Sequence, residues 1–487
     1  MEAKLSTLTY AVRLPVIAKY TGQLLFLLAI LSLPPMLVGV VFGEYGIALR
    51  YALVCLVLVL VTIPLSRLAV PTHIQTNEAL VITSLAFLFS PLIMTYPLMA
   101  SGLPYIDVLF EAVSAITTTG LTTVTELQAR PATFLFARAW MQWYGGLGIV
   151  VLSIALLMGH HLAARQLAEP LRSETMATTA SYHARRMLVI YLIMTVFGLG
   201  LLWALMGDGF HALLHVLSAV STGGFAPHDA SLAVFDSQTV RFAIIMLALL
   251  GAVPLPLYYF GWRKGFSAFV TDIELRGLLL MTIIICLLLV LLMYFKSGFS
   301  WQQSISHGLL LGISAQTTSG FSSMAINNLG DSEKLVIVLA MLTGGGLGST
   351  AGGFKIIRLL ILIRLVHLLI IRTSIPSHAM VKSSLGGRTL DNEDCQRAML
   401  LVFLFIVTVL LSWLIFLWFG YPPLNALFEV VSATGTVGLS TGITQHELPA
   451  LLKMVLCFDM LFGRLEIVAL LISLYPRTWI GKRANLT

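Results

Sequence analysis

Residues 114–121 read SAITTTGL, and this stretch returns in outline three more times along the chain. Each copy has Ser-Ala, four further residues, Gly and then Leu or Phe; the others read SAVSTGGF at 218–225, SAQTTSGF at 314–321 and SATGTVGL at 432–439. A long apolar run stands on each side of every copy. Four units of one kind in a single chain predict four walls around a shared axis, as in a pore.

The composition indicates a polytopic helical membrane protein. Of the 487 residues, 58% are hydrophobic and only 10% are charged, and the mean hydropathy is +0.93. A transmembrane helix needs about 20 apolar residues, and runs of that length recur from end to end. The first run follows Lys4, Arg13 and Lys19 and is longer than the apolar core of a signal peptide, so we expect an uncleaved first span with a cytoplasmic N-terminus.

The net charge of +7 predicts the orientation in the membrane and does not point to a nucleic acid partner. Twenty-two of the 29 Lys and Arg residues fall on alternate connections, which are therefore expected to be cytoplasmic together with both termini. The opposite connections, which carry the repeated stretches, hold Asp107, Glu111, Glu126, Asp208, Asp229, Asp331 and Glu447. These acids would either form an acidic mouth that concentrates cations or be ordinary surface acids.

The predicted fold is an all-α polytopic membrane protein with about ten spans. Two extra N-terminal spans, near 22–43 and 47–69, precede four pseudo-repeats of helix, re-entrant pore loop and helix around one pore, at roughly 77–160, 185–264, 275–372 and 396–476. The corresponding segments of the chain are 1–72 for the N-terminal pair and 73–162, 163–265, 266–390 and 391–487 for repeats 1 to 4.

A short apolar stretch of about 12 residues precedes each repeated loop, as at Ile106–Ile116 and Leu424–Thr434. Such a stretch is too short to cross a bilayer, and Pro104 and Pro422 stand where a missing N–H costs nothing. We expect half-helices that dip into the membrane and aim their partly negative C-terminal ends at the pore centre. Irregular backbone at that depth is tolerated where it lines a water-filled cavity or is buried in protein.

The repeated loops contain what a cation filter requires. Rings of backbone carbonyls can replace the water around a dehydrated monovalent cation, and glycine permits the backbone angles that aim them. The alternative is that these glycines only allow close helix packing. The candidate filter residues are Thr118, Thr119, Gly120, Thr222, Gly223, Gly224, Thr318, Ser319, Gly320, Thr436, Val437 and Gly438.

This pattern resembles the Trk/Ktr/HKT superfamily of potassium transporters, which have four non-identical channel-like repeats. Thr436-Val437-Gly438 also looks like a potassium-channel filter, although Leu439-Ser440 departs from its Tyr-Gly ending. The length and the N-terminal pair are similar to the TrkH family rather than to the shorter KtrB, as are the stretches Gln142–Gly148, Gly344–Arg358 and Gly463–Glu466. The resemblance covers essentially the whole chain.

The resemblance implies uptake of K⁺ across the bacterial inner membrane, with no covalently bound cofactor. It further implies a homodimer in the lipid bilayer and regulation by a TrkA-like cytosolic subunit that binds nucleotides. The short basic segments Arg165–Arg186, Arg263–Lys264 and Arg372–Arg388 are expected to contact an acidic rim of that subunit, or only to set the topology.

Residues 344–355 read GGGLGSTAGGFK and predict a break in a membrane helix. Gly346-x-Gly348-x-x-Ala351 fits a loose dinucleotide fingerprint, but the stretch follows no strand and Lys355 is not placed as in a phosphate loop. By resemblance it is a flexible loop that obstructs the pore beneath the filter; a passive kink is the alternative. The candidate gate residues are Gly344, Gly345, Gly346, Gly348, Gly352, Gly353, Lys355 and Arg464.

Three further charged positions stand inside or beside the apolar runs. Arg464 lies within the last run, where a charge costs about 2.5–3.5 kcal/mol. The resemblance implies that it is a cation barrier in the pore, and a contact with Glu466 or with a carbonyl group is the alternative. Glu111 and Glu429 share one repeat position, and they would hold the loop amides from behind or be solvated at the mouth.

Two other classes of function compete with a gated pore. An intramembrane enzyme would need a nucleophile with a base, or paired acidic metal ligands at helical spacing, and neither pattern is present in the sequence. A carrier that couples potassium to protons or sodium remains an alternative. Four equivalent loops in one orientation favour a fixed pore, because carriers often show inverted repeats.

Overall fold

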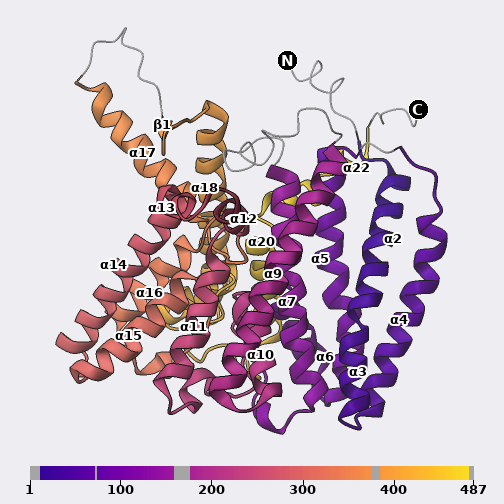
Figure 1. The fold of residues 1–487 in the computed structure, drawn as a ribbon, viewed down its shortest axis with the longest axis horizontal. Helices are drawn as coiled ribbons and strands as arrows, with labels where there is room; N and C mark the ends of the chain where they lie inside the picture. Colours follow the sequence, from indigo (N-terminus) through magenta and orange to yellow (C-terminus); the bar gives the residue numbers. More distant parts are fainter. Residues whose placement is uncertain (1–10, 72–73, 158–175, 375–383, 482–487) are drawn as a thin grey trace.

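The computed structural model describes residues 11–71, 74–157, 176–374 and 384–481. The predicted N-terminal pair is present: α2 (Leu14–Leu31) continues into α3 (Leu33–Val41), and α4 (Tyr45–Ser66) returns beside both (Figure 1). Helix α2 begins well before the predicted start at residue 22. Pro15 lies in the first turn, where its missing N–H costs no hydrogen bond. The helix therefore includes polar residues that precede the apolar run from which its start was predicted.

Four units follow, each with a long helix, a short half-helix, a loop and a second helix. Repeat 1 comprises α5 (Thr76–Leu98), η1 (Met99–Ser101), α6 (Tyr105–Ile116), η2 (Leu127–Ala129) and α7 (Ala132–Leu157). Repeat 2 comprises α9 (Met176–Met206), α10 (Gly209–Val220), η3 (Ser231–Val234), α11 (Gln238–Ala252), α12 (Leu255–Lys264) and α13 (Ser267–Thr271). Repeat 3 comprises α14 (Ile273–Phe295), α15 (Trp301–Gln316), η4 (Ile326–Asn328), α16 (Asp331–Thr343), α17 (Ile356–Arg372) and a hairpin of β1 (Ser384–Leu385) and β2 (Arg388–Thr389). Repeat 4 comprises α18 (Asn392–Trp418), α19 (Pro423–Thr434), α20 (Ala450–Arg464), α21 (Val468–Leu474) and α22 (Pro476–Trp479).

The predicted half-helices are α6, α10, α15 and α19, which have 12, 12, 16 and 12 residues. Twelve helical residues span about 18 Å, well short of a bilayer core of about 30 Å. Their starts are set locally: Pro104 precedes α6, the Asp208 carboxylate caps α10, and Ser300 forms a capping box with Gln303. All four end at the repeated loops, so the prediction of half-helices is confirmed.

The second helix of each repeat is more irregular than the sequence predicts. Only the break at 344–355 was expected, between α16 and α17. Helices α11 and α12 also meet at an angle of 83°, at Pro254, which cannot donate a backbone hydrogen bond. Helix α20 stops before Glu466 and Ile467, which have positive φ angles of 53° and 63°. Within the described ranges, six helices are individually long and apolar enough to span a membrane, so the figure of ten spans stays a prediction.

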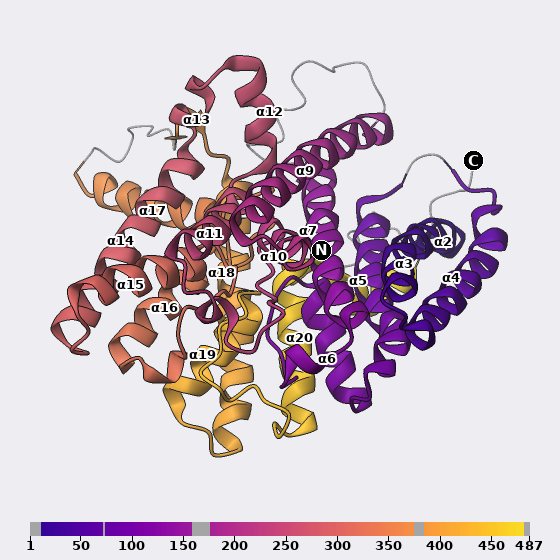
Figure 2. The same ribbon diagram turned by 60° about the horizontal axis from the view of Figure 1, so that its bottom comes forward.

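The repeats pack in a closed cycle. The second helix of each repeat contacts the half-helix of the next repeat, in the pairs α7–α10, α11–α15, α16–α19 and α20–α6 (Figures 1 and 2). The C-terminal parts of the half-helices are buried inside this cycle, whereas α14 and α18 expose apolar side chains such as Ile283 and Phe403. Apolar surface outside and polar loops inside indicate a multi-pass membrane protein.

Candidate functional site

The four repeated loops share one backbone conformation. We name them loop 1 (117–120), loop 2 (221–224), loop 3 (317–320) and loop 4 (435–438). The second residue of each loop is a threonine with φ between 49° and 52°, and the last residue of each loop is a glycine that also has a positive φ. The threonines are Thr118, Thr222, Thr318 and Thr436, and the glycines are Gly120, Gly224, Gly320 and Gly438. Threonine rarely adopts this left-handed conformation, so the loops are held by their surroundings.

The glycines join the four loops into a ring. In each loop the glycine lies against the carbonyl oxygen of the residue that precedes the glycine of the next loop, and loop 4 returns to loop 1. A methyl group added at Gly120 would lie 2.2 Å from Gly223 O, and one added at Gly224 would lie 2.1 Å from Ser319 O. At Gly320 the distance to Val437 O would be 2.1 Å, and at Gly438 the distance to Thr119 O would be 2.3 Å. No side chain fits at any of the four positions. The structure therefore brings together the candidate residues that the sequence scattered over more than 300 positions.

Serine hydroxyls support two of the loops from behind. Ser114 Oγ accepts a hydrogen bond of 3.1 Å from Gly120 N, and Ser432 Oγ accepts one of 3.1 Å from Gly438 N. Ser218, the equivalent residue of repeat 2, instead donates to the Gln142 side chain on α7. In repeats 1 and 4 the serine of the repeated pattern thus supports the loop that follows it.

Glu111 and Glu429 are the buried anchors of the stretches that directly follow loops 1 and 4; we call the stretch after each loop its return segment. Both are fully buried. Glu111 accepts hydrogen bonds from Thr123 N at 3.1 Å and Arg138 Nε at 2.7 Å. Glu429 accepts from Thr441 N at 2.7 Å and from three hydroxyls, those of Ser440, Thr441 and Thr444. Of the two alternatives, the observed one is that these carboxylates hold the loop backbone.

A cavity of about 230 Å³ lies on one side of the ring. All four loop glycines line it, together with Asp229, His228 and Arg138. Of the seven acids predicted at the mouth, all of which lie in described ranges, Asp229 alone lines this cavity. Two of the seven acids take neither predicted role, because Glu111 anchors a loop and Asp107 is buried in an ion pair with Lys453; the other five are exposed.

The glycine-rich segment 344–355 packs against the ring on the side where the half-helices end. Gly352 N donates to Thr318 Oγ1 at 2.7 Å, Gly353 N donates to Gly435 O at 3.0 Å, and Thr350 Oγ1 donates to Val220 O at 3.2 Å. The segment therefore contacts repeats 2, 3 and 4 at once. Except for the half-buried Phe354, its residues are buried. It follows helix α16 rather than a strand, which excludes the dinucleotide-loop reading.

Two buried side chains that the sequence did not single out fasten this segment. Glu274 Oε2 accepts from Leu347 N at 2.8 Å, and Gln316 Nε2 donates to Gly344 O at 2.7 Å. Lys355 has a φ of 74° and its ammonium donates to Ala351 O. The segment is thus an ordered structure with defined partners.

Arg464 ends α20 and is 3% exposed. Its Nη1 donates to Thr350 O at 2.7 Å, and its Nη2 donates to Gly145 O at 3.3 Å. Glu466 pairs with Arg358 of α17. Of the two contacts expected as the alternative to a barrier, the one with carbonyl groups is present, and it ties the glycine-rich segment to repeats 1 and 4; the barrier stays a prediction.

Three further glycines press against the ends of half-helices. A methyl group would lie 2.1 Å from Ile116 O at Gly145, 2.5 Å from Val220 O at Gly251 and 1.8 Å from Thr434 O at Gly463. Each stands 25 to 27 residues after its loop glycine, a periodic signal that the sequence contained and that was missed. These close approaches bring the second helices against the ring.

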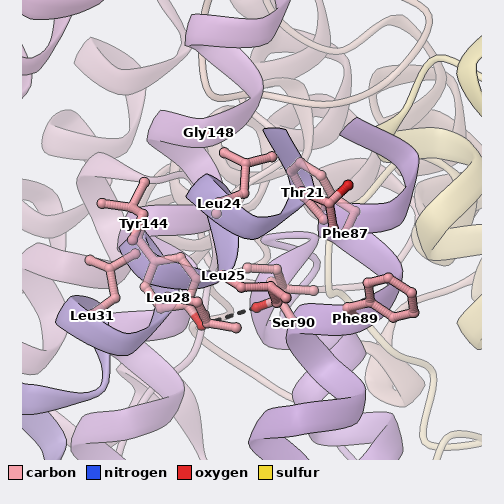
Figure 3. Close-up of a pocket in the computed structure, with 14 residues that line it drawn as sticks. Thr21, Leu24, Leu25, Leu28, Leu31, Phe87, Phe89, Ser90, Tyr144 and Gly148 are labelled. Atoms are coloured by element: carbon pink, nitrogen blue, oxygen red, sulfur yellow. Dashed lines mark hydrogen bonds between the residues drawn. The ribbon is translucent and has the colours of Figure 1, made fainter. Parts of the chain in front are cut away.

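A second cavity, of about 130 Å³, lies between α2, α5 and α7 (Figure 3). Its lining is mostly apolar, with Leu24, Leu28 and Phe87 among the residues, and one polar contact of 3.4 Å joins Ser90 and Tyr144. A cation would find no array of oxygen atoms here. The oxygen atoms that could bind a bare cation are gathered at the ring instead.

Comparison with known proteins gives a consistent result. Residues 52–477 match the family model TrkH, described as a cation transport protein. The chain is 28% identical to the Trk system potassium uptake protein TrkH of Halomonas elongata, over 96% of this chain and 99% of the relative. It is 30% identical to TrkH of Escherichia coli K12, over 77% and 79% of the two chains.

The fold comparison agrees. The crystal structure of the potassium transporter TrkH from Vibrio parahaemolyticus superimposes with a TM-score of 0.87 at 25% identity, over 96% of this chain and 100% of that one. These relatives are transport proteins and not enzymes. The family match covers most of the chain and includes all four loops, so the chain belongs to the TrkH family of cation transport proteins.

Proposed function

We propose that this chain takes up potassium ions through a gated pore whose selectivity filter is the ring of four loops. The filter would consist of Thr118, Thr119, Gly120, Thr222, Gly223, Gly224, Thr318, Ser319, Gly320, Thr436, Val437 and Gly438. The observation that carries this proposal is the cyclic contact of each loop glycine with the neighbouring loop's carbonyl oxygen. A closed ring of carbonyls at the ends of four half-helices supplies oxygen ligands and a favourable dipole for a cation. Potassium as the ion rests on the names of the relatives.

The glycine-rich segment and Arg464 would form the gate. The segment lies across the half-helix ends of three repeats, so an ion leaving the ring on this side meets backbone rather than water. Arg464 adds a positive charge and a hydrogen bond to Thr350 O. The candidate gate residues are Gly344, Gly345, Gly346, Gly348, Gly352, Gly353, Lys355 and Arg464. Displacing the segment would open the path.

The transport mode has a second candidate, a carrier that couples potassium to protons or sodium. Reversal potentials in proteoliposomes separate the two. For an uncoupled pore, the reversal potential follows the potassium gradient alone. A shift of that potential when only the proton or sodium gradient changes would support coupling and contradict the pore.

The family resemblance supports further proposals about assembly. We propose a homodimer in the bacterial inner membrane, with both termini cytoplasmic and with a TrkA-like cytosolic subunit that senses nucleotides. Of the expected docking segments, parts of Arg165–Arg186 and Arg372–Arg388 lie outside the described residues, as does the side chain of Lys264 in Arg263–Lys264. The division of the chain at residues 72, 162, 265 and 390 is likewise a proposal.

A further inference from the structure

Loop 2 lacks a side chain that two of the other loops use. In loop 1 the residue before the glycine, Thr119, has its hydroxyl 2.8 Å from the Thr117 hydroxyl at the half-helix end. In loop 3, Ser319 makes the same link to Thr317 at 3.1 Å. The equivalent residue of loop 2 is Gly223, which has no side chain to form such a link. Two consecutive glycines also leave this loop with more backbone freedom to lose than loops 1 and 3, which have one glycine each.

Gln142 of the neighbouring repeat fills the vacant space. A methyl group added at Gly223 would lie 2.3 Å from Gln142 Cδ, so the glutamine occupies the place of the missing side chain. Gln142 is fully buried on α7. Its Nε2 donates to Gly223 O at 2.6 Å, while its Oε1 accepts from Phe225 N at 3.2 Å and from Ser218 Oγ at 2.8 Å. One amide thus joins the half-helix, the ring carbonyl and the return segment.

The two backbone partners determine the orientation of this amide. Gly223 O only accepts and Phe225 N only donates, so Nε2 must face the first and Oε1 the second. An aliphatic side chain would leave both backbone groups buried without their partner, which destabilises this arrangement of the loop. Gly223 O is also the oxygen against which Gly120 packs, so its position affects the junction between loops 1 and 2.

We infer that Gln142 is a positioning residue that sets the ion selectivity of the ring, by supplying from repeat 1 the support that loop 2 lacks. The inference rests on the proposed function of the ring as a selectivity filter. Three residues further along α7, Gly145 O accepts from Arg464. The same helical turn therefore contacts the ring through Gln142 and the gate arginine through Gly145.

The test is the ratio of potassium to sodium permeability, measured from reversal potentials of the purified full-length protein in proteoliposomes. Gln142→Leu should lower the ratio about tenfold, the effect of losing roughly one buried hydrogen bond at the ring. Gly223→Ser alone should lower it too, because its side chain collides with Gln142. The double variant Gln142→Ala with Gly223→Ser should return to within about threefold of the wild type, since it rebuilds the local link of loop 3.

Relief of the collision alone would return the double variant only to the ratio of Gln142→Ala measured by itself, so recovery beyond that ratio is the decisive result. A double variant no better than Gln142→Ala, or a wild-type ratio in Gln142→Leu, overturns the inference. If Gln142→Leu does not fold, the double variant still decides between rescue and loss, and Gln142→Asn, whose amide is one methylene too short, provides a milder test with an expected lowered ratio.

Two controls separate this inference from the proposed function. Gln238→Leu removes another side-chain amide, whose Oε1 accepts from Ser306 Oγ at an exposed site and not from the ring, and it should leave the ratio unchanged. Gly320→Ser disturbs the ring without touching Gln142. An unchanged ratio in Gly320→Ser would refute the filter itself. A lowered ratio in Gly320→Ser with a wild-type ratio in Gln142→Leu would refute only the role of Gln142.

Discussion

Replacing Arg464 by lysine distinguishes two roles of this residue. Either its hydrogen bonds hold the glycine-rich segment closed, which we call a latch, or its positive charge alone repels cations, which is an electrostatic barrier. The guanidinium reaches two carbonyl oxygens at once, Thr350 O at 2.7 Å and Gly145 O at 3.3 Å. Arg464→Lys keeps the positive charge, but a single ammonium group cannot reproduce this two-pronged contact. Arg464→Met removes both the charge and the contacts. If the contacts hold the segment closed, both variants should leak.

The expected size of the leak follows from these contacts. A hydrogen bond to a charged group is worth about 1.5–3 kcal/mol, and the longer of the two contacts counts for less. The closed arrangement therefore loses about 2–4 kcal/mol in Arg464→Met. At about 1.4 kcal/mol per tenfold change, the open population rises by about 30-fold or more. Arg464→Lys should lie between this variant and the wild type.

The measurement is potassium flux into proteoliposomes without any partner protein, which reports the leak of the closed state. Arg241→Lys is the matched control, since Arg241 also donates to two backbone carbonyls, those of Phe235 and Ala233, near the start of α11, whereas the glycine-rich segment contacts the other end of that helix at Gly251 O. A wild-type leak in Arg464→Lys together with a high leak in Arg464→Met would refute the latch and leave the charge alone as the barrier. Thermal melting in detergent verifies that each variant is folded.

Four other variants and measurements test the remaining assignments. Gly120→Ser should lower the potassium-to-sodium permeability ratio, because φ is +90° and a side chain would collide with Gly223 O; an unchanged ratio in reversal-potential measurements would contradict the ring as filter. Gly352→Ala should raise the leak, since its methyl group would lie 2.1 Å from Gly435 O in the closed segment, whereas Gly200→Ala, with open space around it, is the control and should not. Glu429→Ala should lower the free energy of unfolding by about 2–4 kcal/mol, because four donors lose their acceptor; equal thermal melting of variant and wild type would argue against the anchor. The purified chain should show no saturable binding of ATP or NADH by calorimetry, and tight binding would overturn the assignment of nucleotide sensing to a partner.

The sequence alone determined the architecture of the chain. Glycine spacing, apolar run lengths and short pre-loop stretches are local properties, and they predicted the N-terminal pair, the half-helices α6 and α19, and the break at 344–355. They also identified the residues that meet in the ring, because a repeated pattern implies equivalent positions around an axis. The first helix began earlier than predicted, since its opening turns carry polar residues such as Lys19.

Only the tertiary structure decided what the charged and amide side chains do. From the sequence, Glu111 and Asp107 were candidates for an acidic mouth. In the structure they form buried ion pairs with Arg138 and Lys453 on other helices. Gln142 carries no signal of its role, because its partners lie 76 to 83 positions further along the chain. A buried polar group must find its hydrogen-bond partner wherever the fold provides one, so its role depends on which repeats meet and not on its own neighbours in sequence.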